Sequence, residues 1–390
     1  MNNKNFNFDE IINRRDTHSV KWDHCPNDEV IPMWVADMDF KAAPCIIEAL
    51  QKRLSHEVMG YANVPEEFYH SIINWFDRRH NWHIDRDWID YTTGVVPAVD
   101  AVLRAITTPG EKVVILTPVY NCFFTCIESN KCTPVEVPLT YNSDYSYSIN
   151  YDALEKALSD DNTRTLLFCN PHNPAGRVWR REELQRVNDM CIKHGVKVIS
   201  DEIHCEMMMP GHHYTPFASI SQEAQGNCIT CGSPSKSFNI AGLQAAFIVS
   251  SDPDVKALIN KALIDNQVCN LNPFGLEAFM AAYDHGESWI EALNEYLSGN
   301  FQLMREMMEL ELPAFHITPT EGSYLAWIDV TPTGKTSTEV TQKLLDDGKV
   351  LVNDGAMYGK AGEGFIRINF ATQRSVVKEA TQRIIKAMKE

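Results

Sequence analysis

The middle of the chain alternates short apolar runs, rich in β-branched residues, with longer amphipathic stretches, and this pattern restricts the possible folds strongly. In residues 180–194, Leu184, Val187 and Cys191 recur at intervals of three or four, which is the period of a helix. Six apolar runs are expected to be strands: residues 112–116, 135–139, 165–169, 196–200, 228–230 and 245–249. Such alternation predicts an α/β fold in which helices cover both faces of a mostly parallel sheet.

The carboxyl-terminal third reads differently. A long helical stretch, residues 289–310, is followed by shorter αβ segments and a final helix; these segments are residues 321–330, 337–347 and 364–370. This pattern predicts a smaller α+β domain, and 390 residues are enough for two domains. We expect a large domain at residues 48–285 and a small domain formed by residues 1–47 together with 286–390.

Charge and hydropathy exclude several classes of function. The chain carries 52 acidic and 35 basic residues, a formal net charge of −17, so no general attraction to nucleic acid or to an anionic membrane is expected. No apolar run approaches the roughly 18–20 residues of a membrane-spanning helix. The first six residues lack the basic-then-apolar pattern of an export signal, which favours a cytoplasmic protein.

The cysteines and histidines do not indicate a metal site. Eleven cysteines in 390 residues are too sparse for a disulfide scaffold. Cys228 and Cys231 have the spacing of a redox or metal motif, but they lie in a predicted strand, where residues three apart face opposite sides. His212 and His213 have no third ligand at a suitable spacing. We therefore expect packing and surface roles for these residues.

Polar side chains follow three of the predicted strands directly. The segments concerned are residues 170–176, 201–204 and 233–236. In open parallel sheets, ligands bind beyond the carboxyl ends of the strands. The three segments therefore bring Asn173, Asp201 and Lys236, with the hydroxyls of Ser233 and Ser235, to one crevice.

These groups match what amine chemistry on a pyridine cofactor requires. A lysine binds the cofactor aldehyde and moves a proton at the substrate Cα, and a carboxylate keeps the pyridine nitrogen protonated. In isolation, Lys236 could be a solvated loop residue and Asp201 a helix cap. An acid placed directly after a buried strand, next to an amide and a lysine, favours a site for pyridoxal 5′-phosphate (PLP) that binds Lys236 covalently.

Seven segments, in this order along the chain, carry a family resemblance: residues 13–23, 34–40, 94–97, 118–120, 170–174, 200–204 and 235–243. The sequence resembles the PLP-dependent fold-type I family of class I/II aminotransferases. It resembles more closely the cystathionine β-lyase branch, the MalY/PatB-type C–S lyases. The resemblance implies a seven-stranded, mostly parallel sheet in the large domain. It also implies a homodimer with shared active sites.

The resemblance assigns roles at the cofactor ring. Lys236 would hold PLP, Asp201 would face the pyridine nitrogen and Tyr120 would stack on the ring. Asn173 would reach the ring hydroxyl, with His204 where many relatives place a tyrosine that shares this task. For Tyr120 and His204, core packing is the competing interpretation.

The resemblance also assigns the phosphate and the substrate. The phosphate would bind the backbone N–H groups of Val95 and Val96, which open a helix expected at residues 97–107, together with Ser233 and Ser235. Tyr61 would come from the neighbouring subunit.

Arg367 would bind the substrate α-carboxylate, because an arginine inside an apolar strand is costly unless it is paired. Tyr324 would line the substrate pocket. Many class I/II aminotransferases have a phosphate-binding arginine eight positions after the lysine, but this chain has Gln244 there. That departure favours the lyase branch.

The function that these features predict is β-elimination. A PLP-dependent C–S β-lyase would cleave L-cystathionine or a similar thioether amino acid to a thiol (homocysteine), pyruvate and ammonia. An aminotransferase that uses the same Lys236, Asp201 and Arg367 is the close alternative. A regulatory protein that keeps PLP as a structural ligand is a second alternative, disfavoured by the intact set of polar residues.

Overall fold

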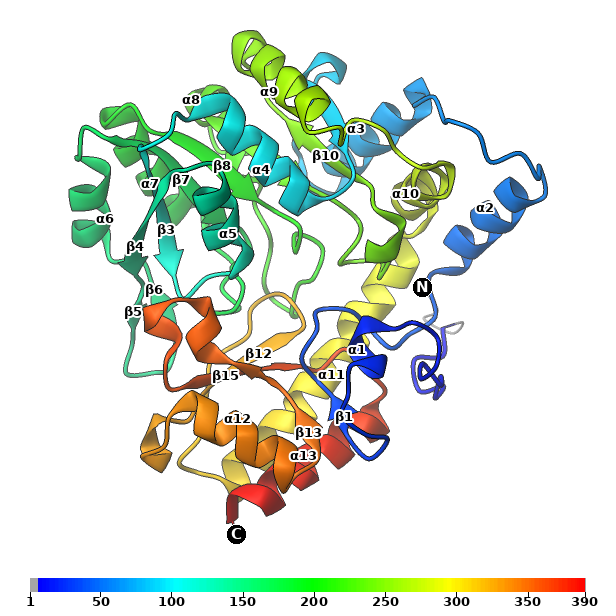
Figure 1. Cartoon of the computed structure of the whole chain (residues 1–390), viewed down its shortest axis with the longest axis vertical. Helices are drawn as coiled ribbons and strands as arrows, with labels where there is room; N and C mark the ends of the chain where they lie inside the picture. Colours follow the sequence, from blue (N-terminus) through cyan, green and yellow to red (C-terminus); the bar gives the residue numbers. More distant parts are fainter. Residues whose placement is uncertain (1–5, 390) are drawn as a thin grey trace.

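Two sheets organise the chain in a computed structural model that describes residues 6–389 (Figure 1). The larger sheet has seven strands in the order β2-β10-β9-β8-β7-β3-β4, and the smaller has four in the order β11-β12-β15-β14. The strands β3, β4, β7, β8 and β9 run parallel, whereas β10 runs antiparallel to both of its neighbours. The predicted α/β class and the seven-stranded, mostly parallel sheet are confirmed. The first five residues, part of the segment in which no export signal is expected, lie outside the described residues.

The strands of the large sheet agree with the predicted runs except at one edge. They are β2 (Ile89–Thr92), β3 (Lys112–Thr117), β4 (Thr133–Pro138), β7 (Thr163–Cys169), β8 (Lys197–Asp201), β9 (Cys228–Gly232) and β10 (Ala246–Val249). The strand β2 was not among the six expected runs. It has only four residues and includes Asp90, so it has no apolar run to mark it.

Alternate residues of each strand face two separate cores. In β3, Val113 and Ile115 join the core beneath α4 (Val95–Ile106), α5 (Cys122–Ser129) and α9 (Pro253–Asp265). Val114 and Leu116 face the opposite core, which contains most of the other helices. Cys228 lies in that opposite core and Cys231 in the α4 core, so the expectation that these two thiols face opposite sides is confirmed.

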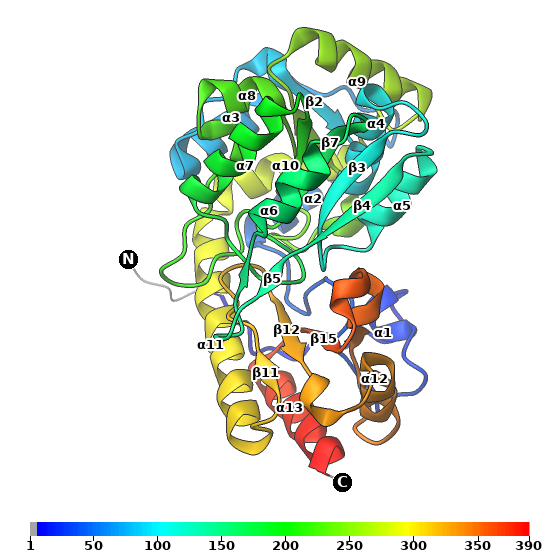
Figure 2. The same cartoon turned by 90° about the vertical axis from the view of Figure 1, so that its left-hand side faces the viewer.

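The second face is covered by more helices than the first. They are α2 (Pro44–Leu54), α3 (Glu66–His80), α6 (Tyr151–Leu158), α7 (Arg181–Lys193), α8 (Gln222–Asn227) and α10 (Pro273–His285). A short hairpin, β5 (Thr140–Tyr141) and β6 (Tyr147–Ser148), extends toward the smaller sheet (Figure 2). There Trp327 donates from Nε1 to the Tyr147 hydroxyl at 3.1 Å.

The carboxyl-terminal part of the chain surrounds the smaller sheet, and a separate two-stranded sheet, β1 with β13, joins it to the amino-terminal segment. The elements of this part are α11 (Glu287–Glu311), β11 (His316–Ile317), β12 (Leu325–Asp329), α12 (Ser337–Asp346), β13 (Val350–Leu351), β14 (Asn353–Asp354), β15 (Phe365–Asn369) and α13 (Arg374–Lys389). Near the amino terminus, α1 (Val20–Asp23) precedes β1 (Ile31–Pro32), which pairs in parallel with β13. The helix α11 runs alongside both sheets (Figures 1 and 2).

One predicted domain limit falls inside a helix and the other falls between two helices. The limit between residues 47 and 48 lies inside α2, and α2 packs against α10 as one helix. The limit at residues 285–286 lies between α10 and α11. The division at these residues stays a prediction. Among the described residues, none of the helices combines the length and apolar composition that crossing a membrane requires.

A glycine pair tests how tightly the larger sheet is packed. A Cβ added at Gly232, the last residue of β9, would lie 2.4 Å from Cζ of Phe247, a ring that is fully buried. Gly232→Ala should therefore lower the free energy of unfolding by about 1–3 kcal/mol. Gly226→Ala, in α8 with open space around it, should leave stability unchanged or raise it by up to about 1 kcal/mol. Urea unfolding of both variants measures the difference, and equal stabilities would contradict the predicted clash.

Candidate active site

The carboxyl ends of β7, β8 and β9 place the three polar segments at one edge of the larger sheet. Cys169 is in register with Asp201, and Asp201 with Cys231, so the residues that follow these strands start side by side. The structure thus brings the segments that contain Asn173, Asp201 and Lys236 together, as the sequence predicts.

Lys236 lies at the centre of this edge. Its Nζ donates to the carbonyl oxygen of Ala36 at 2.7 Å. Burial lowers the pKa of the Lys236 amine to about 8, and the positive charge of Arg367 acts in the same direction, while Asp37 and Asp201 oppose it. A larger fraction of the amine is therefore neutral near pH 7 than for an ordinary lysine, and the neutral amine is the form that attacks an aldehyde or accepts a proton.

Asp201 is the buried acid of the site. Its residue is 4 % exposed, and burial raises the pKa of its carboxyl to about 7, against the lowering effect of the Ile203 N–H, which donates to Oδ1 at 3.1 Å. Glu202 adds a smaller raising effect and Lys236 a lowering one. A carboxyl in this state gains strongly from a cationic partner, such as a protonated ring nitrogen, because the partner would favour its charged form.

Arg367 connects the two sheets at the site. From β15 its Nη1 donates to Oδ1 of Asn173 at 3.1 Å, and its Nη2 donates to the carbonyl oxygen of Trp34 at 2.9 Å. The guanidinium carbon lies 4.9 Å from the centre of the Tyr358 ring. The buried Nε has no hydrogen-bond partner among the described residues, and a buried donor left unpaired is costly.

His204 and Tyr324 complete the wall beside Lys236. Burial, with the charges of Lys236 and Arg367, lowers the pKa of His204 to about 3, so the ring is neutral at pH 7. Its buried Nδ1 has no hydrogen-bond partner among the described residues. The two rings lie 5.9 Å apart at 66°, and the Tyr324 hydroxyl donates to the Ala36 oxygen at 3.0 Å.

Tyr120 lies close enough to Asp201 and Arg367 for their charges to affect its hydroxyl. Burial raises the pKa of Tyr120, and Cys122 raises it further through a hydrogen bond and its charge. The phenol is therefore neutral at pH 7. Its ring is half-buried and contacts Phe123 edge-on, with 6.2 Å between the centres.

The predicted phosphate site consists of a helix start and two serine hydroxyls, and the structure shows how each of them is placed. The helix expected to begin at residue 97 begins two residues earlier, at Val95, so the N–H groups of Val95 and Val96 lie in its first turn. First-turn N–H groups have no partner within the helix and attract anions. The Ser233 hydroxyl, however, already donates to the Ala245 oxygen at 2.7 Å and accepts from the Ser235 N–H at 3.0 Å. Its proton is therefore used within the protein.

The structure does not place Tyr61 with the other site residues. Tyr61 lies between α2 and α3, and its side chain is fully exposed at 105 %. A tyrosine in this position contacts no core of its own chain. Its predicted contact with a neighbouring subunit stays a prediction.

Several residues of the site were not assigned a role from the sequence. Ala36 and Trp34 contribute backbone carbonyl groups, which leave no signal in residue type. Tyr358, which lies against Arg367, accepts from Asn353 at 2.8 Å and is marked only by the glycine that follows it. Residues 34–40 are one of the segments that carry the family resemblance, but the sequence did not predict that this segment contacts Lys236.

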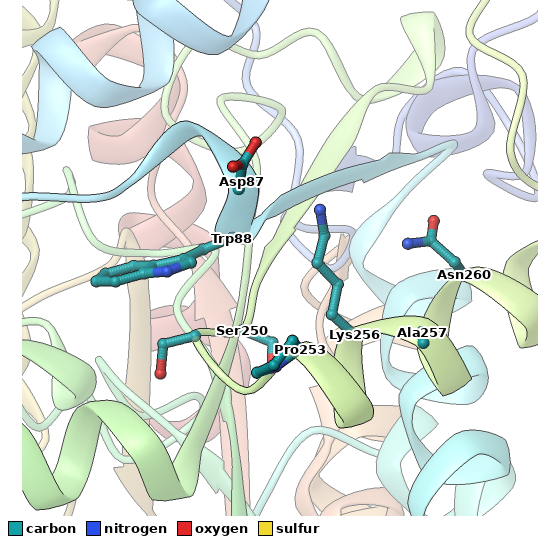
Figure 3. A pocket seen from close by; sticks show the side chains of 8 residues that line it. Asp87, Trp88, Ser250, Pro253, Lys256, Ala257 and Asn260 are labelled. Atoms are coloured by element: carbon teal, nitrogen blue, oxygen red, sulfur yellow. The ribbon is translucent and has the colours of Figure 1, made fainter.

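A hollow lies at the edge of the sheet opposite to Lys236. Figure 3 shows it between the start of β2 and the start of α9, lined by Trp88, Ser250, Lys256 and Asn260. Because β10 is antiparallel to β9, Ser250 lies at the edge away from Lys236. Among residues 6–389, no group of three His, Cys, Asp or Glu residues is placed to hold a metal ion, and His212 and His213 are exposed.

The arrangement fits a covalently bound pyridine cofactor with an anionic substrate. It offers an amine of lowered pKa, a buried carboxyl, and the unpartnered buried Nδ1 of His204 and Nε of Arg367. A ring with polar substituents would supply partners for those buried groups, which are otherwise costly to leave unpaired.

The comparisons with known proteins agree with this class of site. The family model for aminotransferase class I and II matches residues 28–384, and the chain belongs to this family. The cystathionine β-lyase PatB of Bacillus subtilis is 38 % identical over 98 % of this chain and 100 % of its own length. The structure of a PLP-bound putative aminotransferase from Clostridium difficile 630 superposes with a TM-score of 0.96 at 39 % identity, covering 98 % of this chain and 100 % of that one. The PLP-bound C–S lyase of Staphylococcus hominis gives 0.92 at 33 %, covering 99 % of each chain. The predicted family resemblance is confirmed.

The raised pKa of Asp201 makes a prediction for the cofactor-free protein. An aspartate has a pKa of about 3.9 when unfolded, and burial raises it to about 7 in the folded chain. Between these values the folded state binds more protons, so stability falls as pH rises from about 4 to about 7 and then levels off.

Asp201→Asn removes this titration. The melting temperature of the variant, relative to the wild type, should therefore rise across the same pH interval. The same substitution at the exposed Asp161 is the control. A pH-independent difference between Asp201→Asn and the wild type would contradict the raised pKa.

Proposed function

We propose that the protein is a PLP-dependent C–S β-lyase that converts L-cystathionine or a similar thioether amino acid to a thiol, pyruvate and ammonia. The observation that carries the proposal is the convergence of Lys236, Asp201 and Arg367 at one edge of the larger sheet. Lys236 contacts the Ala36 oxygen at 2.7 Å, and Arg367 contacts the Trp34 oxygen at 2.9 Å. The names of relatives that match nearly the whole chain, a cystathionine β-lyase and a C–S lyase, support the choice of reaction.

The residues present fit PLP. Lys236 would bind its aldehyde, Asp201 would pair with the ring nitrogen and Tyr120 would cover the ring. Asn173 accepts from Arg367 through Oδ1, which leaves its Nδ2 donor for the ring hydroxyl, beside His204. The N–H groups of Val95 and Val96 and the hydroxyl of Ser235 would hold the phosphate. PLP supplies an electron sink for the charge that develops at the substrate Cα.

Arg367 and Lys236 then have one task each. Arg367 holds the substrate carboxylate and so orients the Cα–H bond. Lys236, once free, accepts that proton, and its lowered pKa makes the neutral base available near pH 7. As the proton leaves Cα, the electron pair forms a Cα–Cβ double bond and the Cβ–S bond breaks, releasing a thiolate. Hydrolysis of the remaining three-carbon unit yields pyruvate and ammonia.

Gln244 is consistent with the lyase branch. Eight residues after the lysine, it is exposed at the end of a short 3-10 helix, with a φ of 53°. The site therefore has one positive charge fewer for the phosphate than aminotransferases with arginine there. Aminotransferase activity stays the second candidate, because the Clostridium difficile relative is described as a putative aminotransferase.

The proposal extends to assembly and location. The full exposure of Tyr61 supports a homodimer in which this tyrosine reaches the partner's site, since an isolated chain leaves the whole ring in water. A small-molecule amino acid is the proposed substrate. The net charge of −17 argues against a nucleic-acid or membrane partner, and we propose a cytoplasmic enzyme.

The reaction is tested by mixing PLP-loaded protein with L-cystathionine and no keto-acid acceptor. We expect pyruvate and free thiol in equal amounts over many turnovers. Lys236→Ala should lower the rate at least about 100-fold, because the proton acceptor is lost. Lys261→Ala, at an exposed lysine of α9, is the matched control and should retain activity. No pyruvate, together with amino transfer to added 2-oxoglutarate, would instead make the protein an aminotransferase.

Shared sites are tested with mixed dimers. If Lys236 of one subunit works with Tyr61 of the other, then Lys236→Ala and Tyr61→Ala chains, each nearly inactive alone, form mixed dimers with one intact site. Unfolding and refolding an equal mixture should restore about a quarter of the wild-type activity, because half of the dimers are mixed and each has one intact site of two. No recovery, with mixed dimers demonstrated by mass spectrometry, would place Tyr61 outside the partner's site.

A further inference from the structure

An irregular segment crosses the site with its carbonyl groups bound by side chains from distant parts of the chain. We call residues 34–39 the strap. The Trp34 oxygen accepts from Arg367, and the Ala36 oxygen accepts from Lys236 and Tyr324. The remaining strap carbonyls accept from Asn369, Asn239, Arg14 and Gln373. The strap is therefore positioned by side chains rather than by a strand or a helix.

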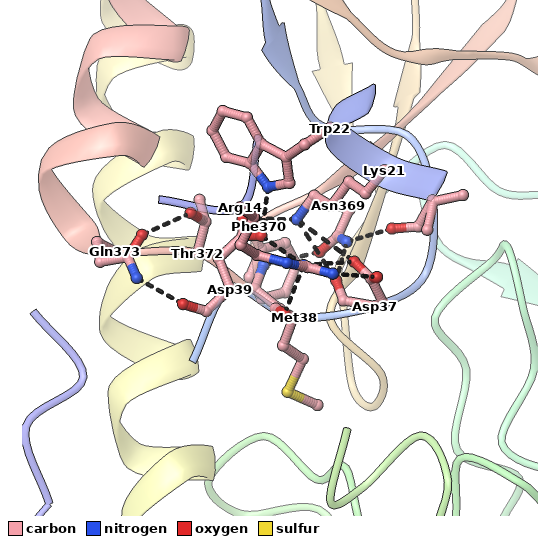
Figure 4. Close-up of polar contacts among 12 residues, drawn as sticks. Arg14, Lys21, Trp22, Asp37, Met38, Asp39, Asn369, Phe370, Thr372 and Gln373 are labelled. Carbon is pink, nitrogen blue, oxygen red and sulfur yellow. Dashed lines mark hydrogen bonds and ion pairs between the residues drawn. The ribbon is translucent and has the colours of Figure 1, made fainter. Parts of the chain in front are cut away.

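A compact ionic cluster, built from the amino-terminal segment, fixes the far end of the strap (Figure 4). Lys21 and Arg14 each contact Asp39 at 2.7 Å, at its two different oxygens. Arg14 also pairs with Asp37 at 2.9 Å and donates to the Met38 oxygen at 2.9 Å. Two cations thus balance two anions around three consecutive strap residues.

The half of the cluster formed by Lys21 and Asp39 is shielded from water, whereas Arg14 and Asp37 are partly exposed. The side chain of Lys21 is fully buried and that of Asp39 is 1 % exposed, and Trp22 donates from Nε1 to Asp39 at 2.7 Å. Burial alone would raise the pKa of Asp39, but Lys21, Trp22 and Arg14 together outweigh it and the pKa is lowered. Because desolvation offsets much of the attraction in a buried pair, such a cluster contributes little net stability. Its effect is to allow one geometry of the strap.

We propose that the cluster of Arg14, Lys21, Asp37 and Asp39 is a positioning device for the active site. It holds the Trp34 and Ala36 carbonyl oxygens where Arg367 and Lys236 meet them. Arg14 is then a positioning residue for both side chains, although it touches neither. This inference rests on the proposed function, in which Lys236 and Arg367 carry out the reaction.

The neighbouring arginine provides a matched control. Arg15 has a similarly covered side chain, 20 % exposed against 22 % for Arg14. It donates to the carbonyl oxygens of Asp28 and Val30, at 2.8 and 3.0 Å, and its guanidinium lies over the Trp22 ring. None of its hydrogen bonds or ion pairs among the described residues reaches the strap, although Trp22 itself donates to Asp39. Arg15→Ala therefore loosens the amino-terminal segment without releasing the strap.

The test compares Arg14→Ala with Arg15→Ala in PLP-loaded protein. Arg14→Ala should lower kcat/KM by roughly 10- to 100-fold, the size expected when reacting groups lose their exact placement. Arg15→Ala should stay near the wild-type value. Because Arg14 is partly exposed, millimolar guanidinium should enter the vacated space and restore part of the activity of Arg14→Ala alone. Arg14→Lys keeps the positive charge but loses the bidentate guanidinium. Its kcat/KM should therefore lie between those of the wild type and Arg14→Ala.

Hydrogen exchange supplies a readout that does not depend on catalysis. The Met38 N–H donates to Asn239 and the Asp39 N–H to the Ala371 oxygen. In Arg14→Ala or Arg14→Lys these amides should exchange faster than in Arg15→Ala, with and without PLP. If the wild type shows no elimination, the proposed function fails, but exchange still decides the role of the cluster. Unchanged exchange at residues 34–39, or equal loss of activity in the Ala variants of Arg14 and Arg15, would overturn the proposal.

Discussion

Cys169, Asp201 and Cys231 lie side by side in the parallel register of β7, β8 and β9, so these three strands end together at one edge of the sheet. Asn173, Asp201 and Lys236 depend on this shared edge. Parallel strands are buried on both faces, and ligands bind at and just beyond their carboxyl ends, where Asp201 is the last residue of β8. The seven-stranded sheet therefore does more than form a core. It brings an amide, a carboxyl and an amine from separate segments to one place without any of them lying close in sequence.

Burial at that edge sets the protonation states. It raises the pKa of Asp201 to about 7 and lowers that of Lys236 to about 8, and it keeps His204 neutral. The two shifts have one cause, because a low-dielectric environment disfavours charge of either sign. A bound cofactor with a cationic ring nitrogen would favour the charged carboxylate, while a free lysine amine of lowered pKa accepts a proton. One buried environment therefore shifts the pKa values of both groups toward neutral pH, as is typical of functional sites.

The smaller sheet and the amino-terminal segment close the site from the other side. Arg367 reaches from β15 to Asn173 in the turn after β7 and to the Trp34 carbonyl, and the ring of Tyr358 lies against it. Lys236 reaches the neighbouring Ala36 carbonyl. Residues from three regions of the chain thus meet around a few backbone atoms. The ionic cluster of Arg14 and Lys21 with Asp37 and Asp39 holds that backbone segment, and its position decides where both side chains point.

The sequence by itself determined the α/β class, the strands at the centre of the sheet and the convergence of Asn173, Asp201 and Lys236. These follow from residue patterns that repeat locally and from the rule that parallel strands end at a common edge. It did not determine β2, whose four residues include an aspartate, or the start of α4 at Val95. Only the tertiary structure decided that Ala36 and Trp34 take part, because they act through carbonyl groups that every residue has. It also decided that the Ser233 hydroxyl is already engaged and that Tyr358 lies against Arg367. These contacts join residues far apart along the chain, and no local pattern records such a contact.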